Sequence, residues 1–295
     1  MKTGFVGLGA MGLPMARNLH RAGLLAGVSN RTPTKAEQLA AETGCAAAGS
    51  PEDLAAMCEA VVICVSADAD VLAVTDALAA AGKPGLLVLD CSTVSSETAK
   101  QADRRMRESG GRFLDCPVSG GTEGAQRGTL SIMVGGEPDD VAAAGPILQA
   151  MGGSITHMGP VGAGQATKAT NQIMVAGINQ AVTEALAFGQ AQGLPTDRLI
   201  GALEKGAAGN WFLSHRGPTM VRGEYPLGFK VDLHAKDLRI CRAMGDALGV
   251  RLPMVEMTLI HYSRLLDEGS VDEDISALFR LKSDMFSGQN NQKKD

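Results

Sequence analysis

Short apolar runs alternate with helical patterns through the first half of the chain. Within residues 11–22 the apolar side chains recur at helical spacing, and Gly23 ends the pattern. A second helix is expected to begin with Thr34 as its cap and to end at Gly44. This alternation predicts an open, mostly parallel, doubly wound α/β sheet with helices on both faces. The expected strands lie at residues 2–6, 24–30, 61–66, 86–92, 112–119 and 130–136.

Polar clusters follow five of these apolar runs, at the points where strands are expected to end. Because the carboxyl ends of parallel strands meet at one edge of a sheet, we expect the clusters to surround a single ligand crevice. The clusters comprise residues 7–12, 30–32, 66–68, 92–93 and 119–121.

The first cluster carries three glycines in a G-x-G-x-x-G pattern between a predicted strand and a predicted helix. Gly7 permits a tight turn, Gly9 lets the backbone approach a pyrophosphate, and Gly12 lets the helix pack close to the sheet. The N-terminus of that helix offers N–H groups and the positive end of its dipole to phosphates. Together with the converging clusters, the pattern predicts a dinucleotide site formed by Gly7, Leu8, Gly9, Ala10, Met11 and Gly12.

The end of the second predicted strand bears on which dinucleotide binds. An NAD site usually places an Asp or Glu about 20 residues past the glycines, where it binds the ribose 2′-hydroxyl. Asn30 stands there instead and would not repel a 2′-phosphate. Arg31 can bind such a phosphate through two charge-assisted hydrogen bonds, and Thr32 adds a hydroxyl donor. Lys35 can add a further positive charge. These residues favour NADP(H). NAD(H) is the alternative, in which Arg31 is a solvated charge and Asn30 holds a ribose hydroxyl.

The second half of the chain is predicted to be helical. Residues 166–192 are expected to form one long helix, roughly 40 Å at 1.5 Å per residue, which Gly193 and Pro195 end. Lys168 and Asn171 share a face of its first turns because they lie three residues apart. Further helices are expected near residues 196–206, 233–249, 253–267 and 271–285. The predicted parts are a dinucleotide-binding domain at 1–161, an all-helical substrate and oligomerisation domain at 162–286, and a disordered tail at 287–295.

Composition and charge exclude several classes of protein. The 295 residues carry a net charge of −5 and only 3% are aromatic, which argues against a nucleic-acid partner. No apolar stretch is long enough to predict a membrane span, and the first apolar run feeds the glycine turn rather than a signal peptide. The six cysteines are scattered and the five histidines lack ligand spacing. We therefore expect reduced thiols, a cytoplasmic location and no metal.

Four segments, in order along the chain, carry a resemblance: GFVGLGAMGLPMARNL at 4–19, DCPVSGG at 115–121, GAGQATKATNQ at 162–172 and DLHAKDL at 232–238. In these segments the chain resembles the β-hydroxyacid dehydrogenase family. That family includes 3-hydroxyisobutyrate dehydrogenase, tartronate semialdehyde reductase and the glyoxylate/succinic semialdehyde reductases. The resemblance implies a Rossmann-type N-terminal domain and an all-helical C-terminal domain joined by the long helix.

The resemblance also implies roles for individual residues. Lys168 matches the family's catalytic lysine, with Asn171 beside it. The substrate is expected at Ser119, Gly120 and Gly121. Cofactor contacts beyond the glycine loop are expected from Asn30, Arg31, Thr32, Ser66, Ala67, Ser92, Thr93 and Lys236, the last of which is followed by Asp237.

The expected reaction is hydride transfer between a bound nicotinamide and a short aldehyde or 2-oxo acid that carries a carboxylate, with Lys168 as acid and base. Tartronate semialdehyde, glyoxylate and succinic semialdehyde are candidate substrates. The single tryptophan, Trp211, either covers the substrate or belongs to the core. One alternative is an NAD-linked dehydrogenase of 3-hydroxyisobutyrate or a serine-like acid, and another is a non-catalytic dinucleotide-binding module. The resemblance implies a homodimer or homotetramer.

Overall fold

The computed structural model describes residues 1–290, which divide into two compact units. The first unit ends at Lys168 and the second begins at Ala169. The first unit has two buried apolar cores and the second has one, and the boundary between the units falls within one long helix.

The first unit contains a sheet formed by β1 (Thr3–Val6), β2 (Leu25–Ser29), β3 (Ala46–Ala47), β4 (Ala60–Ile63), β5 (Leu87–Asp90), β6 (Arg112–Asp115), β7 (Val118–Ser119), β8 (Leu130–Gly135) and β9 (Gly152–Gly159). The strands lie in the order β3-β2-β1-β4-β5-β6-β8-β7, with β9 beside β8. Strands β1 to β6 pair in parallel, whereas β8 runs antiparallel to β6 and β7. The parallel part has the strand order of dinucleotide-binding sheets.

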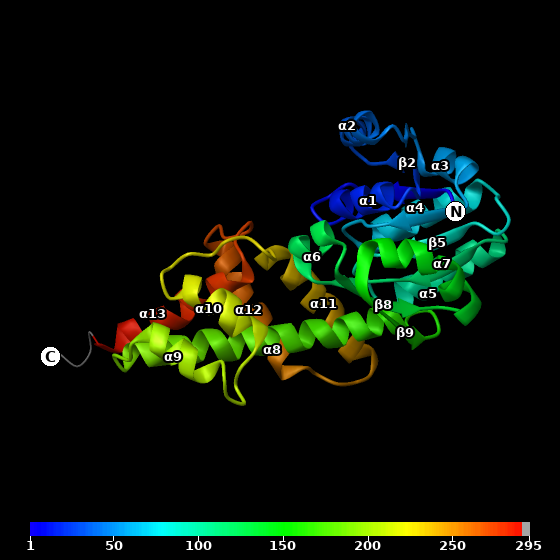
Figure 1. Cartoon of the computed structure of the whole chain (residues 1–295). Coiled ribbons are helices and arrows are strands. Elements are labelled where there is room, and N and C mark those ends of the chain that lie inside the picture. Colours follow the sequence, from blue (N-terminus) through cyan, green and yellow to red (C-terminus); the bar gives the residue numbers. More distant parts are fainter. Residues whose placement is uncertain (291–295) are drawn as a thin grey trace. The chain divides into compact units, whose positions relative to one another are not determined.

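Helices cover both faces of this sheet (Figure 1). Phe5 belongs to the core that contains Met15 of one helix, whereas the next residue, Val6, belongs to the core that contains Leu54 of another. Alternate side chains along the strands therefore fill two cores, and the predicted doubly wound sheet is confirmed. One face carries α1 (Gly12–Arg21), α2 (Pro33–Thr43), α6 (Gly121–Arg127) and α7 (Pro138–Met151), and the other carries α3 (Pro51–Met57), α4 (Asp68–Ala80) and α5 (Ser96–Glu108).

Three details differ from the sequence analysis. The strand expected at 112–119 is interrupted, because β6 ends at Asp115 and Pro117 has no N–H to offer a ladder. Helix α2 begins at Pro33, whose fixed φ suits the first helical position, so Thr34 is not its cap. Strands β3 and β9 lie outside the predicted strands. The former has only two residues, and the latter is largely exposed and has glycine at both ends.

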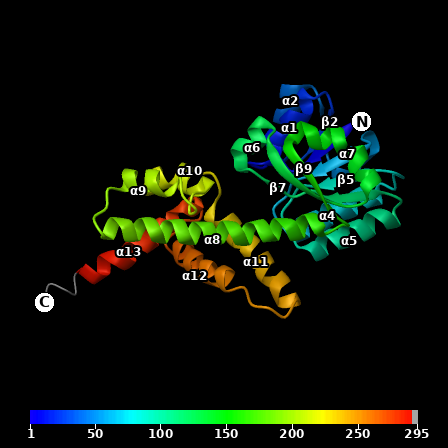
Figure 2. The ribbon, with the colours of Figure 1, turned by 60° about the horizontal axis from the view of Figure 1, so that its bottom comes forward.

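The second unit is helical in the residues that the structure describes (Figure 2). The long helix α8 starts at Ala163 rather than Ala166. Helix α10 was absent from the predicted set, since Gly217 and Pro218 obscure its pattern, and Asn210 caps it by accepting the Leu213 N–H at 2.9 Å. The helices are α8 (Ala163–Ala191), α9 (Thr196–Leu203), α10 (Trp211–Met220), α11 (Val231–Ala247), α12 (Pro253–Asp267), the 3₁₀ helix η1 (Ile275–Ala277) and α13 (Leu278–Asn290).

The end of the chain differs in part from the expected tail. Residues 287–290 belong to α13 rather than to a disordered segment. Residues 291–295 lie outside the described residues. Among residues 1–290, no helix is long and apolar enough to cross a membrane.

Candidate active site

The glycine loop lies between β1 and α1, and its three glycines meet different surroundings. Gly7 has a φ of 97°, and a Cβ there would overlap the carbonyl oxygen of Cys64. A Cβ on Gly12 would overlap the carbonyl oxygen of Gly7, so α1 begins in close contact with the turn. A Cβ on Gly9 would meet no atom within 4 Å. The backbone is therefore tightly packed at Gly7 and Gly12 and open at Gly9, which is the arrangement that a close-lying pyrophosphate requires.

Asn30 ties the loop after β2 to the glycine loop. Its Oδ1 accepts the N–H of Leu8 at 2.8 Å, and its Nδ2 donates to the carbonyl of Thr32 at 3.0 Å. The N–H of Gly7 also donates to the carbonyl of Ser29, at 3.0 Å. A carboxylate at position 30 would lose the donor to Thr32, so the amide is the group that fits both bonds.

Cationic side chains lie around this pair of loops. Arg31 is largely exposed, and its closest carboxylate is that of Asp70 on α4, at 3.7 Å. A cavity of about 280 Å³ beside Gly9 is lined by Lys35 and Arg17 among others. Arg17 forms a two-point ion pair with Glu42, at 2.9 and 2.7 Å, which holds α1 to α2. Of these three cations, Arg17 has a close carboxylate partner, whereas the ion pair of Arg31 is long.

The loop after β5 is held from both sides. The hydroxyl of Ser92 accepts the N–H of Val65 in the loop after β4, at 2.9 Å, and its own N–H donates to Asp90. Only 2% of Ser92 is exposed, so this hydroxyl positions the loop. Thr93 beside it is partly exposed, as is Ala67 at the start of α4, and Ser66 is exposed. These residues form the same edge of the sheet as the glycine loop.

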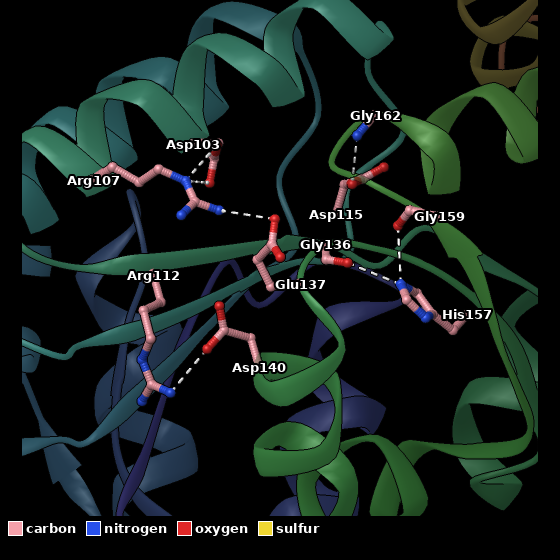
Figure 3. Close-up of polar contacts among 10 residues, drawn as sticks. All are labelled: Asp103, Arg107, Arg112, Asp115, Gly136, Glu137, Asp140, His157, Gly159 and Gly162. Atoms are coloured by element: carbon pink, nitrogen blue, oxygen red, sulfur yellow. Dashed lines mark hydrogen bonds and ion pairs between the residues drawn. The ribbon is translucent and has the colours of Figure 1, made fainter.

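Asp115 connects the end of β6 to the start of α8 (Figure 3). Its Oδ1 accepts the N–H of Gly162 and its Oδ2 the N–H of Gln165, each at 2.8 Å. The side chain of Gln165 continues the connection, since it donates to the carbonyl of Ser92 at 2.8 Å and accepts the N–H of Val94 at 3.2 Å. Lys168 follows on the same helix and is buried. The helix that carries Lys168 is thus bonded to the strand ends.

The predicted substrate segment lies at the turn from β7 into α6. Ser119 ends β7 and is partly exposed, and Gly120 and Gly121 have φ of 132° and 62°. Both glycines are exposed. Successive N–H groups in a turn of this kind form a concave site for a small anion.

In the second unit, a chain of side-chain contacts joins Asn171 on α8 to Lys236 on α11. Asn171 Nδ2 donates to the Oε1 of Gln172 at 2.8 Å, and Gln172 Nε2 donates to Asp237 Oδ2 at 2.6 Å. The other oxygen of Asp237 lies 3.0 Å from Lys236 Nζ. The amide of Gln172 and the carboxylate of Asp237 thus hold the two predicted site residues in fixed positions.

Trp211 is the first residue of α10 and is 58% exposed, so the alternative that it belongs to the core is wrong. Its ring stacks on that of His215 with the centroids 4.4 Å apart. The helix begins with this flat surface directed to solvent. Its expected role over the substrate stays a prediction.

In the first unit most of the predicted residues lie in the loops at the strand ends, and in the second unit Asn171 is joined to Lys236, whereas Trp211 lies on α10. The residues that sequence reasoning missed are Asp90, Asp115, Gln165 and Gln172, all buried and all polar. For Asp90 and Asp115 the sequence did contain a signal, because each is an acidic residue at the end of an apolar run. No group of three or more His, Cys, Asp or Glu side chains suited to a metal occurs in the described part of the chain.

Comparison with known proteins supports the fold and the class of protein. Residues 2–159 match the NAD binding domain of 6-phosphogluconate dehydrogenase, and residues 162–282 match the NAD-binding domain of NADP-dependent 3-hydroxyisobutyrate dehydrogenase. The chain is 37% identical to the NAD-dependent L-serine dehydrogenase of Pseudomonas aeruginosa, over 94% of this chain and 96% of that protein. It is 36% identical to the 2-hydroxy-3-oxopropionate reductase of Escherichia coli, over 94% and 96%.

A solved structure shows the same likeness. The 3-hydroxyisobutyrate dehydrogenase of Mycobacterium tuberculosis with L-serine superposes with a TM-score of 0.88 at 30% identity, covering 95% of this chain and 98% of that chain. The fold, the glycine loop and these matches define an NAD(P)-dependent oxidoreductase that acts on hydroxyl groups. The chain belongs to the β-hydroxyacid dehydrogenase family, as its four motifs predict.

Proposed function

We propose that the protein is an NADP(H)-dependent reductase of a short aldehyde or 2-oxo acid that carries a carboxylate, of the tartronate semialdehyde, glyoxylate or succinic semialdehyde type. The observation that carries the cofactor preference is the end of β2. Asn30 replaces a carboxylate there, and its amide is engaged with Leu8 and Thr32. Arg31 and Lys35 supply positive charge next to that position, which suits a 2′-phosphate.

The chemistry divides between the cofactor and the chain. A bound nicotinamide dinucleotide gives or accepts the hydride. In the reducing direction the ammonium of Lys168 stabilises the developing oxyanion and donates the proton. In the oxidising direction the neutral amine accepts the hydroxyl proton. Asn171 holds the substrate oxygen or orients the lysine.

The substrate carboxylate binds at the turn from β7 into α6. Ser119 supplies a hydroxyl, and the exposed backbone of Gly120 and Gly121 supplies N–H donors. A short acid or semialdehyde fits a site that fixes the carboxylate with a few donors and leaves the carbonyl for Lys168. Trp211 is a further substrate-binding residue in this proposal.

A second candidate is the NAD-linked oxidation of 3-hydroxyisobutyrate or a serine-like 3-hydroxyacid. It is favoured by the relative named NAD-dependent L-serine dehydrogenase and by the related 3-hydroxyisobutyrate dehydrogenase structure with L-serine. In this function Asn30 bonds a ribose hydroxyl, and Arg31 is a solvated charge.

A kinetic screen separates the two candidates. Both cofactors are tested in both directions against tartronate semialdehyde, glyoxylate, succinic semialdehyde, 3-hydroxyisobutyrate and L-serine. We expect the highest kcat/KM for NADPH with one of the three aldehydes or oxo acids. A preference for NAD⁺ with L-serine or 3-hydroxyisobutyrate would replace the first candidate by the second, and no turnover with any pair would reject both.

We also propose that the protein forms a homodimer or homotetramer through its helical unit. Large apolar side chains are exposed there, among them Met174 and Phe188 on α8 and Ile260 on α12. Exposed apolar surface of this kind marks an interaction site when it is contiguous. Light scattering on the purified protein measures the mass, and a monomer at micromolar concentration would contradict the proposal.

A further inference from the structure

Two buried acids stand side by side at the edge of the sheet where the predicted site lies. Asp90 ends β5 and Asp115 ends β6, and the two residues are register partners in the parallel pair. Neither side chain is exposed to solvent. Register partners point to the same face of a sheet, and neighbouring strands lie about 4.8 Å apart. Two carboxyl groups this close do not both ionise readily, because the charges repel in a poorly screened interior.

The two acids have different hydrogen-bond partners. Asp115 accepts the N–H of Gly162 on one oxygen (Figure 3) and the N–H of Gln165 on the other. The backbone also closes around it, because a Cβ on Gly164 would stand 2.8 Å from Asp115 Oδ2. Burial raises the pKa of Asp115, and the N–H groups that it accepts oppose this rise because they stabilise the charged form.

Asp90 has the surroundings of a neutral acid. Its Oδ1 accepts the N–H of Ser92 at 2.9 Å, but its Oδ2 is buried without a hydrogen-bond partner among the described residues. An ionised carboxylate oxygen that is buried without a hydrogen-bond partner would lower the stability of the fold. Burial raises the pKa of Asp90 to about 7, against the opposing hydrogen bonds of Ser92, and the charges of Asp115 and Asp68 also raise it.

The groups around this pair are few. Asp68 faces it from α4, and the thiols of Cys91 and Cys116 lie next to it on the adjoining loops. On α5, the Cε of Lys100 lies close to Gly162 at the start of α8. Burial raises the pKa of both thiols well above their ordinary value, so they stay neutral.

We propose that Asp115 is the positioning residue for Lys168 and acts as a carboxylate, while its register partner Asp90 is held as a neutral acid. Asp115 accepts the N–H of Gly162, just before α8, and that of Gln165 in its first turn, and so fixes where the following turn, with Lys168, stands relative to the strand ends. Gln165 bonds residues 92 and 94 from the same turn, so the helix and the loop after β5 are fixed together. The role of Lys168 in this proposal rests on the proposed function.

Two isosteric substitutions form a matched pair, Asp90→Asn and Asp115→Asn. Asparagine resembles a neutral acid, so we expect Asp90→Asn to keep kcat within threefold of the unchanged protein. In Asp115→Asn an amide NH₂ faces a backbone N–H, because asparagine has one acceptor oxygen where two N–H groups must be bonded. We expect kcat to fall at least tenfold, while the dissociation constant of the cofactor stays within threefold, since the glycine loop and Asn30 are unchanged.

Thermal melts between pH 5 and 8.5 test the pair without any turnover. An Asp ionises near pH 4 in the unfolded chain and near 7 at position 90, so folding retains a proton between these values. The stability that comes from this proton is present at low pH and is lost as the pH rises through about 7. Asp90→Asn has no such loss. Its Tm relative to the unchanged protein should therefore rise by at least about 3 °C from pH 5 to 8.5.

Several outcomes would overturn the inference. Equal losses of kcat in the two variants would contradict the asymmetry, and so would a kcat for Asp115→Asn within threefold. If the difference in Tm between Asp90→Asn and the unchanged protein does not change with pH, Asp90 is not held as a neutral acid. If Asp115→Asn does not fold, Gln165→Leu tests the link from α8 to the loop, and an unchanged kcat there would reject it. If the unchanged protein shows no turnover, the proposed function fails, and the melts still decide the state of Asp90.

Discussion

The two units hold their predicted site residues in different ways. In the first unit the loops at the strand ends are joined largely through backbone groups, such as the N–H groups of Leu8 and Val65 that Asn30 and Ser92 accept. In the second unit the contacts run from side chain to side chain between two helices, through Gln172 and Asp237. Parallel strands bring their ends together by pairing, whereas helices need side chains to fix one another.

This difference indicates which substitutions should matter in each unit. In the first unit the shape of the backbone carries the site, so added bulk at a glycine should have a large effect. In the second unit, loss of a single buried hydrogen-bonding side chain leaves its partner unsatisfied, which costs about 1–3 kcal/mol. The variants below test this contrast, beginning with the residue that ends the first unit.

The largest effect is expected for Lys168→Ala. We expect kcat to fall about 10²- to 10⁴-fold, the range of general acid–base catalysis, because the proton donor is removed. Cofactor affinity, measured by fluorescence titration, should change less than threefold, since the contacts of the glycine loop remain. Lys168→Arg is the matched variant, which keeps the charge but does not exchange a proton at neutral pH. A kcat for Lys168→Ala above a tenth of the original would contradict the mechanism.

Gly12→Ala and Gly9→Ala test the backbone-based site of the first unit. A Cβ on Gly12 overlaps the Gly7 carbonyl, so we expect a loss of about 1–3 kcal/mol in stability, or about 2–10 °C in Tm. A Cβ on Gly9 meets open space, so its Tm should be unchanged. We expect Gly9→Ala to weaken cofactor binding at least tenfold, because the methyl group occupies the space that the pyrophosphate needs. Similar Tm losses in the two variants would refute the distinction.

Sequence patterns predicted the parts of the fold that local chemistry determines. The first strands, the glycine turn and the long helix follow from apolar periodicity and from Gly and Pro positions. Strand pairing then follows from the doubly wound arrangement, which explains why five polar clusters lie at one edge. Helix α10 was missed because Gly217 and Pro218 interrupt its pattern, although Asn210 supplies a cap.

The missed site residues depend on contacts between distant parts of the chain. Gln165 bonds Ser92, and Gln172 bonds Asp237, and neither partner is near in sequence. The Asp90–Asp115 pair arises only from the register of β5 against β6. Such pairings are set by tertiary packing, so a single sequence contains the residues but not their partners.

Gln172→Leu tests the side-chain network of the second unit. Asp237 is buried, and loss of the Gln172 donor leaves its Oδ2 without that bond. We expect kcat to fall about tenfold through displaced Asn171 and Lys236, with a loss of about 1–3 kcal/mol in stability. Gln180→Leu is the matched control, because Gln180 is equally buried on α8 but bonds Thr258. Gln180→Leu should lose similar stability and keep its kcat. Equal losses of kcat in the two variants would show that Gln172 affects turnover only through stability.

The smallest effect is expected for Arg31→Ala, which removes an exposed side chain from a loop otherwise fixed by backbone contacts. Its ion pair with Asp70 is long, at 3.7 Å, so its loss should not change the Tm measurably. Affinity for NADPH should fall about three- to tenfold, because one charge-assisted contact is lost where solvent screens it. Affinity for NADH should stay unchanged, and the difference between the cofactors should shrink as salt is added. An equal loss for both cofactors would show that Arg31 does not read the 2′-phosphate, and the choice of NADP(H) at this loop would be wrong.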